Sequence, residues 1–240
     1  MGMNQLEIIL YSHIDYLDVC EVFFHQMKKY IPNFDITILI NQDSDKIPQN
    51  YKKIFYDDNL PYRSRLLESL KKVDSNVILF IHEDMFLYDN INEKVIFEFV
   101  DLIYENKVDL IKLIKTDGHR GKSQIHPNLV KSPSNNLFSI QPTLCKRTTL
   151  IKILENVNGS SIYDIEYNVS KTCNDLGFSN SFMSSCDDEP KRGSAHFDSH
   201  IFPYVATAIN KGRWNFMEYN KELSDILNET KIDENIRGVI

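Results

Sequence analysis

Apolar and polar residues follow two different rhythms in the first half of this chain. Short continuous apolar runs are typical of buried strands, and apolar residues that recur every three or four positions are typical of amphipathic helices. The predicted strands lie at 6–11, 36–40, 53–56, 77–81 and 108–114. One predicted helix begins near 17, and two others lie at 63–73 and 91–104. Because strand and helix alternate, we predict an α/β fold with a mostly parallel central sheet and helices on both faces.

The pattern changes after Lys115. Residues 116–136 are polar and contain glycine and proline, which predicts a long loop of the kind that often carries function. We predict one domain over 1–215, followed by a polar, loosely docked tail at 216–240. The remaining expected elements are strands at 137–140 and 182–186 and helices at 148–157, 165–176 and 202–210.

Composition limits the possible classes of protein. The formal net charge is −7 and the basic residues are scattered, so we expect no nucleic-acid partner. The four cysteines show no CxxC spacing, which disfavours a zinc ribbon or a dithiol redox site. No apolar run reaches the roughly 20 residues that a membrane crossing requires, and the amino terminus shows no secretory signal. We therefore expect no transmembrane segment and a cytoplasmic location.

Three ionisable residues, His82, Glu83 and Asp84, directly follow the apolar run 77–81. Open α/β sheets bind ligands at the carboxyl ends of their strands, and buried acids are rare unless they are paired or bind a metal. Mg²⁺ and Mn²⁺ favour oxygen ligands, usually one or two carboxylates with substrate phosphates and water. We predict that Asp84 binds such a metal and that Glu83 or His82 contacts the metal or a nucleotide. The alternative is a strand end that is merely solvated.

Two arginines and two histidines are further candidates. Arg63 and Arg65 lie near the start of the helix that leads into this strand, where a guanidinium is suited to pairing with a phosphate or with an acid. His196 and His200 are four residues apart, so both rings would share one face of a helix, and either is suited to completing the metal site. Exposed helical arginines and exposed loop histidines are the alternatives.

A second acidic segment, Tyr-Asp-Ile-Glu at 163–166, opens a predicted helix. Asp164 or Glu166 is a candidate general base that removes a proton from an acceptor hydroxyl. Carboxylates are also favoured there because they cap a helix and complement its dipole, so a structural role is the alternative. The Gly-Lys-Ser segment at 121–123 does not form a phosphate-binding P-loop, because Thr116 stands where the motif requires glycine.

The order of motifs carries more information than any one of them. An opening strand and helix, a polar loop near Asp43, a Pro-Tyr-x-x-Arg-Leu-x-x-x-Leu helix at 61–70 and an apolar strand ending in Glu-Asp-x-Phe-Leu follow one another. Further motifs follow at 139–142, 146–154, 163–166 and 212–214. This order resembles that of small glycosyltransferases with the GT-A fold, a Rossmann-like arrangement. One departure is that His82 stands where a strict Asp-x-Asp motif places its first acid.

The resemblance implies that residues 1–115 bind a nucleotide-sugar donor and that 116–215 bind a glycan, lipid-linked or protein acceptor. It implies Mn²⁺- or Mg²⁺-dependent sugar transfer in polysaccharide or glycan biosynthesis, with inversion at the sugar carbon because a separate carboxylate activates the acceptor. The implied residues are donor contacts Asp43, Arg63, Arg65, His82 and Glu83, metal ligands Asp84, His196 and His200, and catalytic Asp164 and Glu166.

Two other functions would use the same residues. A metal-dependent nucleotidyltransferase or phosphohydrolase would need the acids without a sugar acceptor, although the sequence lacks the dense acidic cluster that suits a two-metal site. A catalytically inactive nucleotide-sugar-binding module is the third alternative, and His82 within the acidic motif is the feature that supports it.

Overall fold

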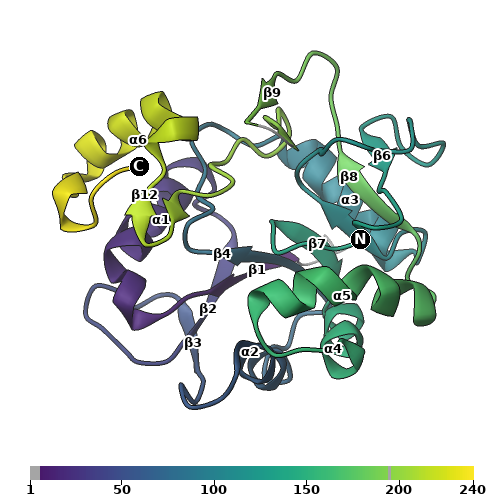
Figure 1. Cartoon of the computed structure of the whole chain (residues 1–240), viewed down its shortest axis with the longest axis horizontal. Coiled ribbons are helices and arrows are strands. Elements are labelled where there is room, and N and C mark those ends of the chain that lie inside the picture. The colour runs from purple at the N-terminus through teal and green to yellow at the C-terminus, as the bar shows by residue number, and fades with distance from the viewer. Residues whose placement is uncertain (1–5, 194–195) are drawn as a thin grey trace.

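The computed structural model describes residues 6–193 and 196–240, and within them eight strands form the central sheet. Their order is β3-β2-β1-β4-β7-β5-β8-β6 (Figure 1). The first four strands in this order are mutually parallel, and so are β5 and β8, whereas β7 and β6 run antiparallel to their neighbours. The strands are β1 Leu6–Tyr11, β2 Asp35–Ile40, β3 Lys52–Phe55, β4 Val77–His82, β5 Leu110–Lys112, β6 Leu129–Lys131, β7 Thr143–Lys146 and β8 Ser181–Ser184.

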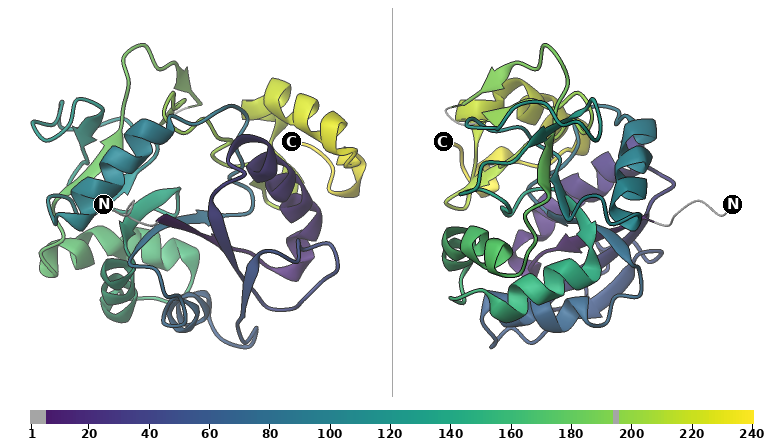
Figure 2. Two further views of the ribbon diagram at one scale, coloured as in Figure 1. Left: turned by 180° about the vertical axis from the view of Figure 1, so that it is seen from behind. Right: turned by 90° about the vertical axis from the view of Figure 1, so that its right-hand side faces the viewer.

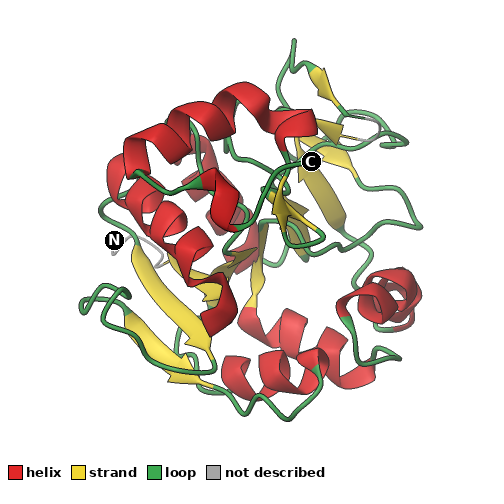
Figure 3. Ribbon diagram, turned by 60° about the vertical axis from the view of Figure 1, so that its left-hand side comes forward, coloured by secondary structure: helices red, strands yellow, loops and turns green. Residues whose placement is uncertain are grey.

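Helices cover both faces of this sheet. They are α1 Leu17–Tyr30, α2 Tyr62–Leu70, α3 Glu93–Tyr104, α4 Arg147–Asn156, α5 Ile162–Asp175 and α6 Phe216–Thr230. α1 and α3 lie on one face, and α2, α4 and α5 pack together on the other (Figure 2). Figure 3 shows the same layers, with helices on either side of the strands. The predicted architecture is confirmed. None of the helices in the described part of the chain has the length and apolar character that a membrane crossing needs.

The two central strands, β1 and β4, are buried along their whole length because both faces of the sheet are covered. Their continuous apolar sequences are what such a position requires. The two strands pair in parallel register, and Tyr11 lies opposite His82 at the carboxyl edge. The loop after β1 and the acidic segment after β4 therefore begin side by side.

The segment that precedes α6 differs from the prediction. We predict a helix at 202–210, but the structure has irregular chain there, which ends in the short strand β11 (Ile209–Asn210). Its backbone bonds instead to the turn after β4: Val205 N–H donates to the Phe86 carbonyl, and Ala208 N–H donates to the Asp84 carbonyl, each at 3.0 Å. These long-range hydrogen bonds replace helical ones and hold the segment beside the acidic motif.

Smaller differences concern the middle of the chain. The strand predicted at 137–140 is not formed in the described residues, and the predicted loop at 116–136 contains β6. Three short strands complete the described chain: β9 Lys191–Arg192, β10 His196–Phe197 and β12 Arg213–Trp214, which pairs with β11. Two single-turn 3₁₀ helices lie at Ile14–Tyr16 and Glu234–Ile236.

The last part of the chain is held by specific contacts, although its polar composition predicts a loosely docked tail. Residues 216–230 form α6, whose Leu223 and Leu227 are buried and which packs against α1. Beyond it the chain returns to α1, where the Arg237 guanidinium donates to the Asp18 carboxylate at 2.6 Å. The apolar residues of α6 recur at helical spacing, so their periodicity indicates a docked helix better than the overall composition does.

Candidate active site

A cleft of ≈ 600 Å³ opens at the carboxyl edge of the sheet, between the ends of β1 and β4 and the first turns of α5. Its walls come from both halves of the chain, including the irregular segment before α6. Ligands of open α/β sheets bind at this edge. The structure brings together five of the predicted site residues here, and they are Arg65, His82, Glu83, Asp84 and Glu166.

Asp84 lies in the turn directly after β4 and is partly buried. Burial raises the pKa of its carboxyl well above the usual range, and the backbone N–H of Ile209 opposes this shift by hydrogen bonding to the carboxylate. Among the described residues, no basic side chain contributes to that pKa. A carboxylate that is withdrawn from water but lacks a protein cation is the oxygen donor that a divalent ion prefers.

Glu83 and His82 flank this position with different surroundings. Burial and the neighbouring charge of Asp84 raise the pKa of Glu83, which receives a hydrogen bond from Ser12. The His82 ring stacks on Tyr11 with 5.3 Å between ring centroids, and its Nε2 lies 2.9 Å from the Tyr62 hydroxyl. Burial lowers the pKa of His82 to about 4, so its imidazole is neutral at pH 7.

The residues of the cleft fit a metal ion that shares its ligands with a substrate. Within residues 6–193 and 196–240, no group of three or more His, Cys, Asp or Glu side chains is arranged to hold a metal. A complete protein cage is therefore not present in the described chain. Mg²⁺ and Mn²⁺ do not require one, because they are commonly bound by one or two carboxylates together with phosphates and water. Asp84 supplies a carboxylate of that kind.

Three other predicted site residues do not line the cleft. His196 lies on β10, and its Nε2 is 2.9 Å from the Tyr219 hydroxyl of α6. His200 is exposed and lies in a loop, where its backbone N–H donates to the buried Glu189 carboxylate at 3.2 Å. Asp43 lies in the loop after β2 and pairs with Lys53 at 2.6 Å. The structure therefore does not bring these residues to Asp84.

The two predicted arginines take different positions because they are two residues apart on α2. Arg65 lines the cleft, and its Nη1 lies 2.9 Å from the Asp58 carboxylate. Arg63 points elsewhere, and its Nη1 donates to the backbone carbonyl of Val157 at 2.7 Å. Residues i and i+2 of a helix face different directions, so only one of this pair can face the cleft.

The two acids of α5 separate in the same way. Asp164 forms a capping box with Ser161: its carboxylate accepts from the Ser161 N–H at 3.1 Å, and its own N–H donates to the Ser161 hydroxyl at 3.1 Å. Hydrogen bonds to its carboxylate, first from the Ser161 hydroxyl and then from the Ser161 and Ser160 N–H groups, lower the pKa of Asp164. Glu166 lines the cleft instead, and its carboxylate accepts from the backbone N–H of Ile140 at 2.8 Å.

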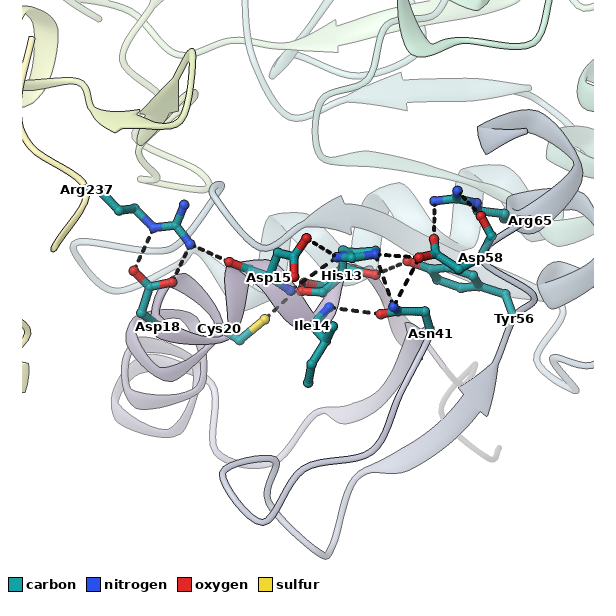
Figure 4. A network of polar contacts seen from close by, with 11 residues as sticks. His13, Ile14, Asp15, Asp18, Cys20, Asn41, Tyr56, Asp58, Arg65 and Arg237 are labelled. Atoms are coloured by element: carbon teal, nitrogen blue, oxygen red, sulfur yellow. Dashed lines mark hydrogen bonds and ion pairs between the residues drawn. The ribbon is translucent and has the colours of Figure 1, made fainter. Parts of the chain in front are cut away.

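Our sequence reasoning missed a polar network that borders the cleft after β1 (Figure 4). His13 Nδ1 accepts from the Asp15 N–H at 3.1 Å, which leaves Nε2 to donate to the Asp58 carboxylate at 3.0 Å. Arg65 pairs with the same carboxylate, so Asp58 joins the loop after β1 to α2. His13 is the second residue after the central strand β1, and a polar residue just past such a strand is the same signal that identifies the acidic residues after β4.

Two other cleft residues had no such signal. Gln141 lies before β7, and its amide is held by the Tyr204 hydroxyl, which donates to Oε1 at 2.7 Å. Lys211 follows β11 in the left-handed region, with φ of 51°. Both positions depend on irregular segments that tertiary contacts shape, so neither spacing nor periodicity indicates them.

No family model and no curated protein matches this sequence. Among solved structures, a cytidylyltransferase from Leptospira borgpetersenii serovar Hardjo-bovis is similar over 96% of this chain and 97% of its own, with a TM-score of 0.51 and 12% sequence identity. At that identity the likeness shows the fold alone. This chain therefore has a GT-A-like, Rossmann-like α/β fold, which confirms the predicted fold class.

Two weaker likenesses concern parts of longer proteins. The mannosyltransferase PcManGT from Pyrobaculum calidifontis, solved with GDP-Man and Mn²⁺, has a TM-score of 0.47 and 11% identity over 79% of this chain and 58% of its own. TarS from S. aureus has a TM-score of 0.47 and 12% identity over 97% of this chain and 41% of its own. This chain spans less than two thirds of the length of either protein.

Proposed function

We propose that this protein is a glycosyltransferase that moves a sugar from a nucleotide-sugar donor to a hydroxyl acceptor, with Mn²⁺ or Mg²⁺ as cofactor. The proposal rests on one observation: Asp84 after β4 and Glu166 on α5 line the same cleft at the carboxyl edge of the sheet. Such a cleft offers one carboxylate to the metal-bound diphosphate of a donor and a separate carboxylate to an acceptor.

The donor side of the proposed site is the end of β4. Asp84 would hold the divalent ion, which when bound offsets the negative charge of the diphosphate leaving group. Arg65 and Lys211 also line the cleft. Arg65 is fixed by Asp58, whereas Lys211 forms no ion pair with any residue that the structure describes, so Lys211 would approach the diphosphate.

The acceptor side is formed by α5. The Ile140 N–H fixes the Glu166 carboxylate, which would take the proton from the acceptor hydroxyl as the hydroxyl oxygen attacks the anomeric carbon. The bond between that carbon and the diphosphate oxygen breaks on the opposite face, so the nucleoside diphosphate leaves and the configuration of the sugar carbon inverts. Glu166 therefore fits the role of general base better than Asp164, whose carboxylate caps α5.

Nucleotidyl transfer is the second candidate, because the similar cytidylyltransferase shares the fold. Two features of the cleft favour glycosyl transfer. The loop 12–16 after β1 contains no glycine, so it lacks the close backbone approach with which glycine-rich loops hold phosphate chains. The acceptor side also carries a carboxylate, Glu166, which suits a hydroxyl better than a phosphate.

A thermal-shift experiment with nucleoside diphosphates, with and without Mn²⁺, tests the donor site. We expect the diphosphate of one base to raise the Tm of the wild-type protein only when metal is present, because a ligand that binds the folded state alone stabilises it. Asp84→Asn should lose this metal-dependent increase. Asp225→Asn is the matched control, since it changes an exposed, ion-paired carboxylate of α6. Equal Tm increases in wild type and Asp84→Asn would contradict the metal assignment.

The reaction products separate the two candidate functions. A glycosyltransferase should slowly release nucleoside diphosphate from its nucleotide sugar, because water replaces the acceptor. A nucleotidyltransferase should release pyrophosphate from a nucleoside triphosphate. Pyrophosphate release without nucleoside diphosphate release from any nucleotide sugar would replace our proposal with the second candidate.

A further inference from the structure

Two tyrosines on α5 are almost fully exposed. Tyr163 has 84% and Tyr167 has 89% of its surface accessible, and they are the only tyrosines among the exposed large apolar residues of the described chain. Their spacing of i, i+4 puts both rings on one face of the helix. Tyrosine rings contribute most to folding when they are buried, so this pair adds little to the stability of the fold. Isolated exposed apolar residues are ordinary, whereas a pair beside a cleft indicates a binding surface.

Tyr163 lies at the mouth of the candidate active site, and Tyr167 lies one turn further along α5 on the same face. Tyr163 lines the cleft and also a second, open hollow of ≈ 410 Å³, which continues outward along α2 and the start of α5. Glu166 is three residues from Tyr163, which makes the two residues neighbours on the helix surface, and both line the cleft. A ligand that rests on the Tyr163 ring therefore lies next to the proposed general base, and the Tyr167 ring extends the contact along α5.

The cations around the pair are ion-paired. Lys171, one turn beyond Tyr167 on the same face of α5, pairs with Asp175 at 2.8 Å. Arg65 contributes the cationic side chain of the hollow, and Asp58 neutralises it at 2.9 Å. Asp164 and Glu166 flank the rings along α5. An anionic ligand or an anionic membrane surface would therefore meet carboxylates and ion-paired cations instead of the unpaired lysines and arginines that such partners require. The remaining side chains of the hollow are uncharged, and they are Pro61, Tyr62, Ser160, Ser161, Ile162 and Tyr163.

A sugar ring matches this chemistry. It has an apolar face of C–H groups that packs against an aromatic ring, and a rim of hydroxyl groups that hydrogen-bonds to serine and tyrosine. We infer that Tyr163 and Tyr167 form a platform that binds a neutral saccharide, and that this saccharide is the acceptor of the transferase. The second part of the inference depends on the proposed function. The platform would direct a hydroxyl of the terminal sugar toward Glu166.

Saturation-transfer NMR with neutral oligosaccharides of glucose, galactose or N-acetylglucosamine tests the platform without nucleotide or metal. We expect the wild-type protein to bind one of these series and Tyr167→Ala to weaken binding about threefold to tenfold, the contribution of one aromatic contact. Tyr167→Phe should bind like wild type because it retains the ring. Met217→Ala is the matched control: Met217 is also 84% exposed but lies on α6.

Three results would overturn the platform. The first is that the wild-type protein binds no saccharide, and the second is that Tyr163→Ala and Tyr167→Ala both bind saccharide as tightly as wild type does. The third is that phosphatidylglycerol–phosphatidylcholine vesicles capture the protein through the two rings while no saccharide binds. These failures leave the metal-dependent diphosphate experiment unaffected, so the proposed function would survive them. If the protein binds saccharide but no nucleoside diphosphate, the result would support the platform and contradict the proposed transferase function.

Discussion

At the scale of single residues, the phase of a helix decides between candidates of the same chemical type. Asp164 and Glu166 are two residues apart on α5, and only Glu166 reaches the cleft, since Asp164 completes the capping box. The sequence identifies the segment, but the choice between its two acids requires the position of the helix start, which Ser161 fixes by accepting from the Asp164 N–H.

Replacing each of the two acids of α5 by its amide, in separate variants, tests this assignment. Glu166→Gln should lower kcat for sugar transfer by about 100-fold or more, because a positioned general base contributes that much to the rate. Nucleoside diphosphate binding should remain, since the donor side does not use Glu166. Asp164→Asn should keep transfer and lower the Tm, because it weakens the cap of α5. Initial rates and thermal melts check both variants, and equal rate losses in the two would contradict the assignment.

Lys112 on β5 predicts a pH dependence of stability. It is fully buried, and its ammonium group donates to the Asn136 side-chain carbonyl at 2.8 Å. Burial lowers its pKa from 10.5 to about 7. Between these two values the unfolded chain binds more protons than the folded one, so this lysine makes stability rise with pH by up to about 1.4 kcal/mol per pH unit.

Lys112→Met should remove this contribution. Urea unfolding of wild type and variant between pH 7 and pH 9.5 measures the free energy of unfolding of each. The contributions of other groups that titrate in this range cancel when the two free energies are subtracted. We expect the stability of wild type relative to the variant to increase with pH. A difference that stays constant over this range would show that Lys112 keeps an ordinary pKa in the folded protein.

At the scale of secondary-structure elements, predictability follows the range of the contacts that form each element. β1, β4, α1 and α3 are predicted because local periodicity and two-sided burial agree. The helix expected at 202–210 is wrong because hydrogen bonds to the turn after β4, more than 100 positions earlier, fix that segment. Lys211 and Gln141 reach the cleft through such segments, so the sequence does not predict them.

The docking of α6 gives a prediction at this scale. Leu223 is fully buried where α6 packs on the body of the protein. Leu223→Ala should lower the free energy of unfolding by about 3 kcal/mol, because it removes buried methyl groups and leaves a cavity. Met217→Ala on the exposed side of α6 should change it by less than about 0.5 kcal/mol. Chemical denaturation measures both, and a loss below about 1 kcal/mol for Leu223→Ala would indicate that α6 is loosely attached.

At the scale of the whole molecule, the first and second halves of the chain share one sheet. The order β4-β7-β5 places β7, from the second half, between two strands of the first. β7 pairs with β4 along Val77–Phe80 and with β5 along Leu110–Lys112. The cleft lies where the halves meet, so Asp84 and Glu166 are held at a fixed separation by the sheet rather than by a flexible linker.

This interleaving predicts that the halves do not fold separately. A fragment of residues 1–115 lacks β7 and β8, which leaves one edge of β4 and both edges of β5 without partners and exposes apolar surface that the whole chain buries. We expect the fragment to be unfolded or aggregated, and the whole chain to unfold in one transition by near- and far-ultraviolet circular dichroism. A fragment with dispersed amide signals and a cooperative melt would show that residues 1–115 are an independent unit, and the cleft would then lie between two bodies free to move.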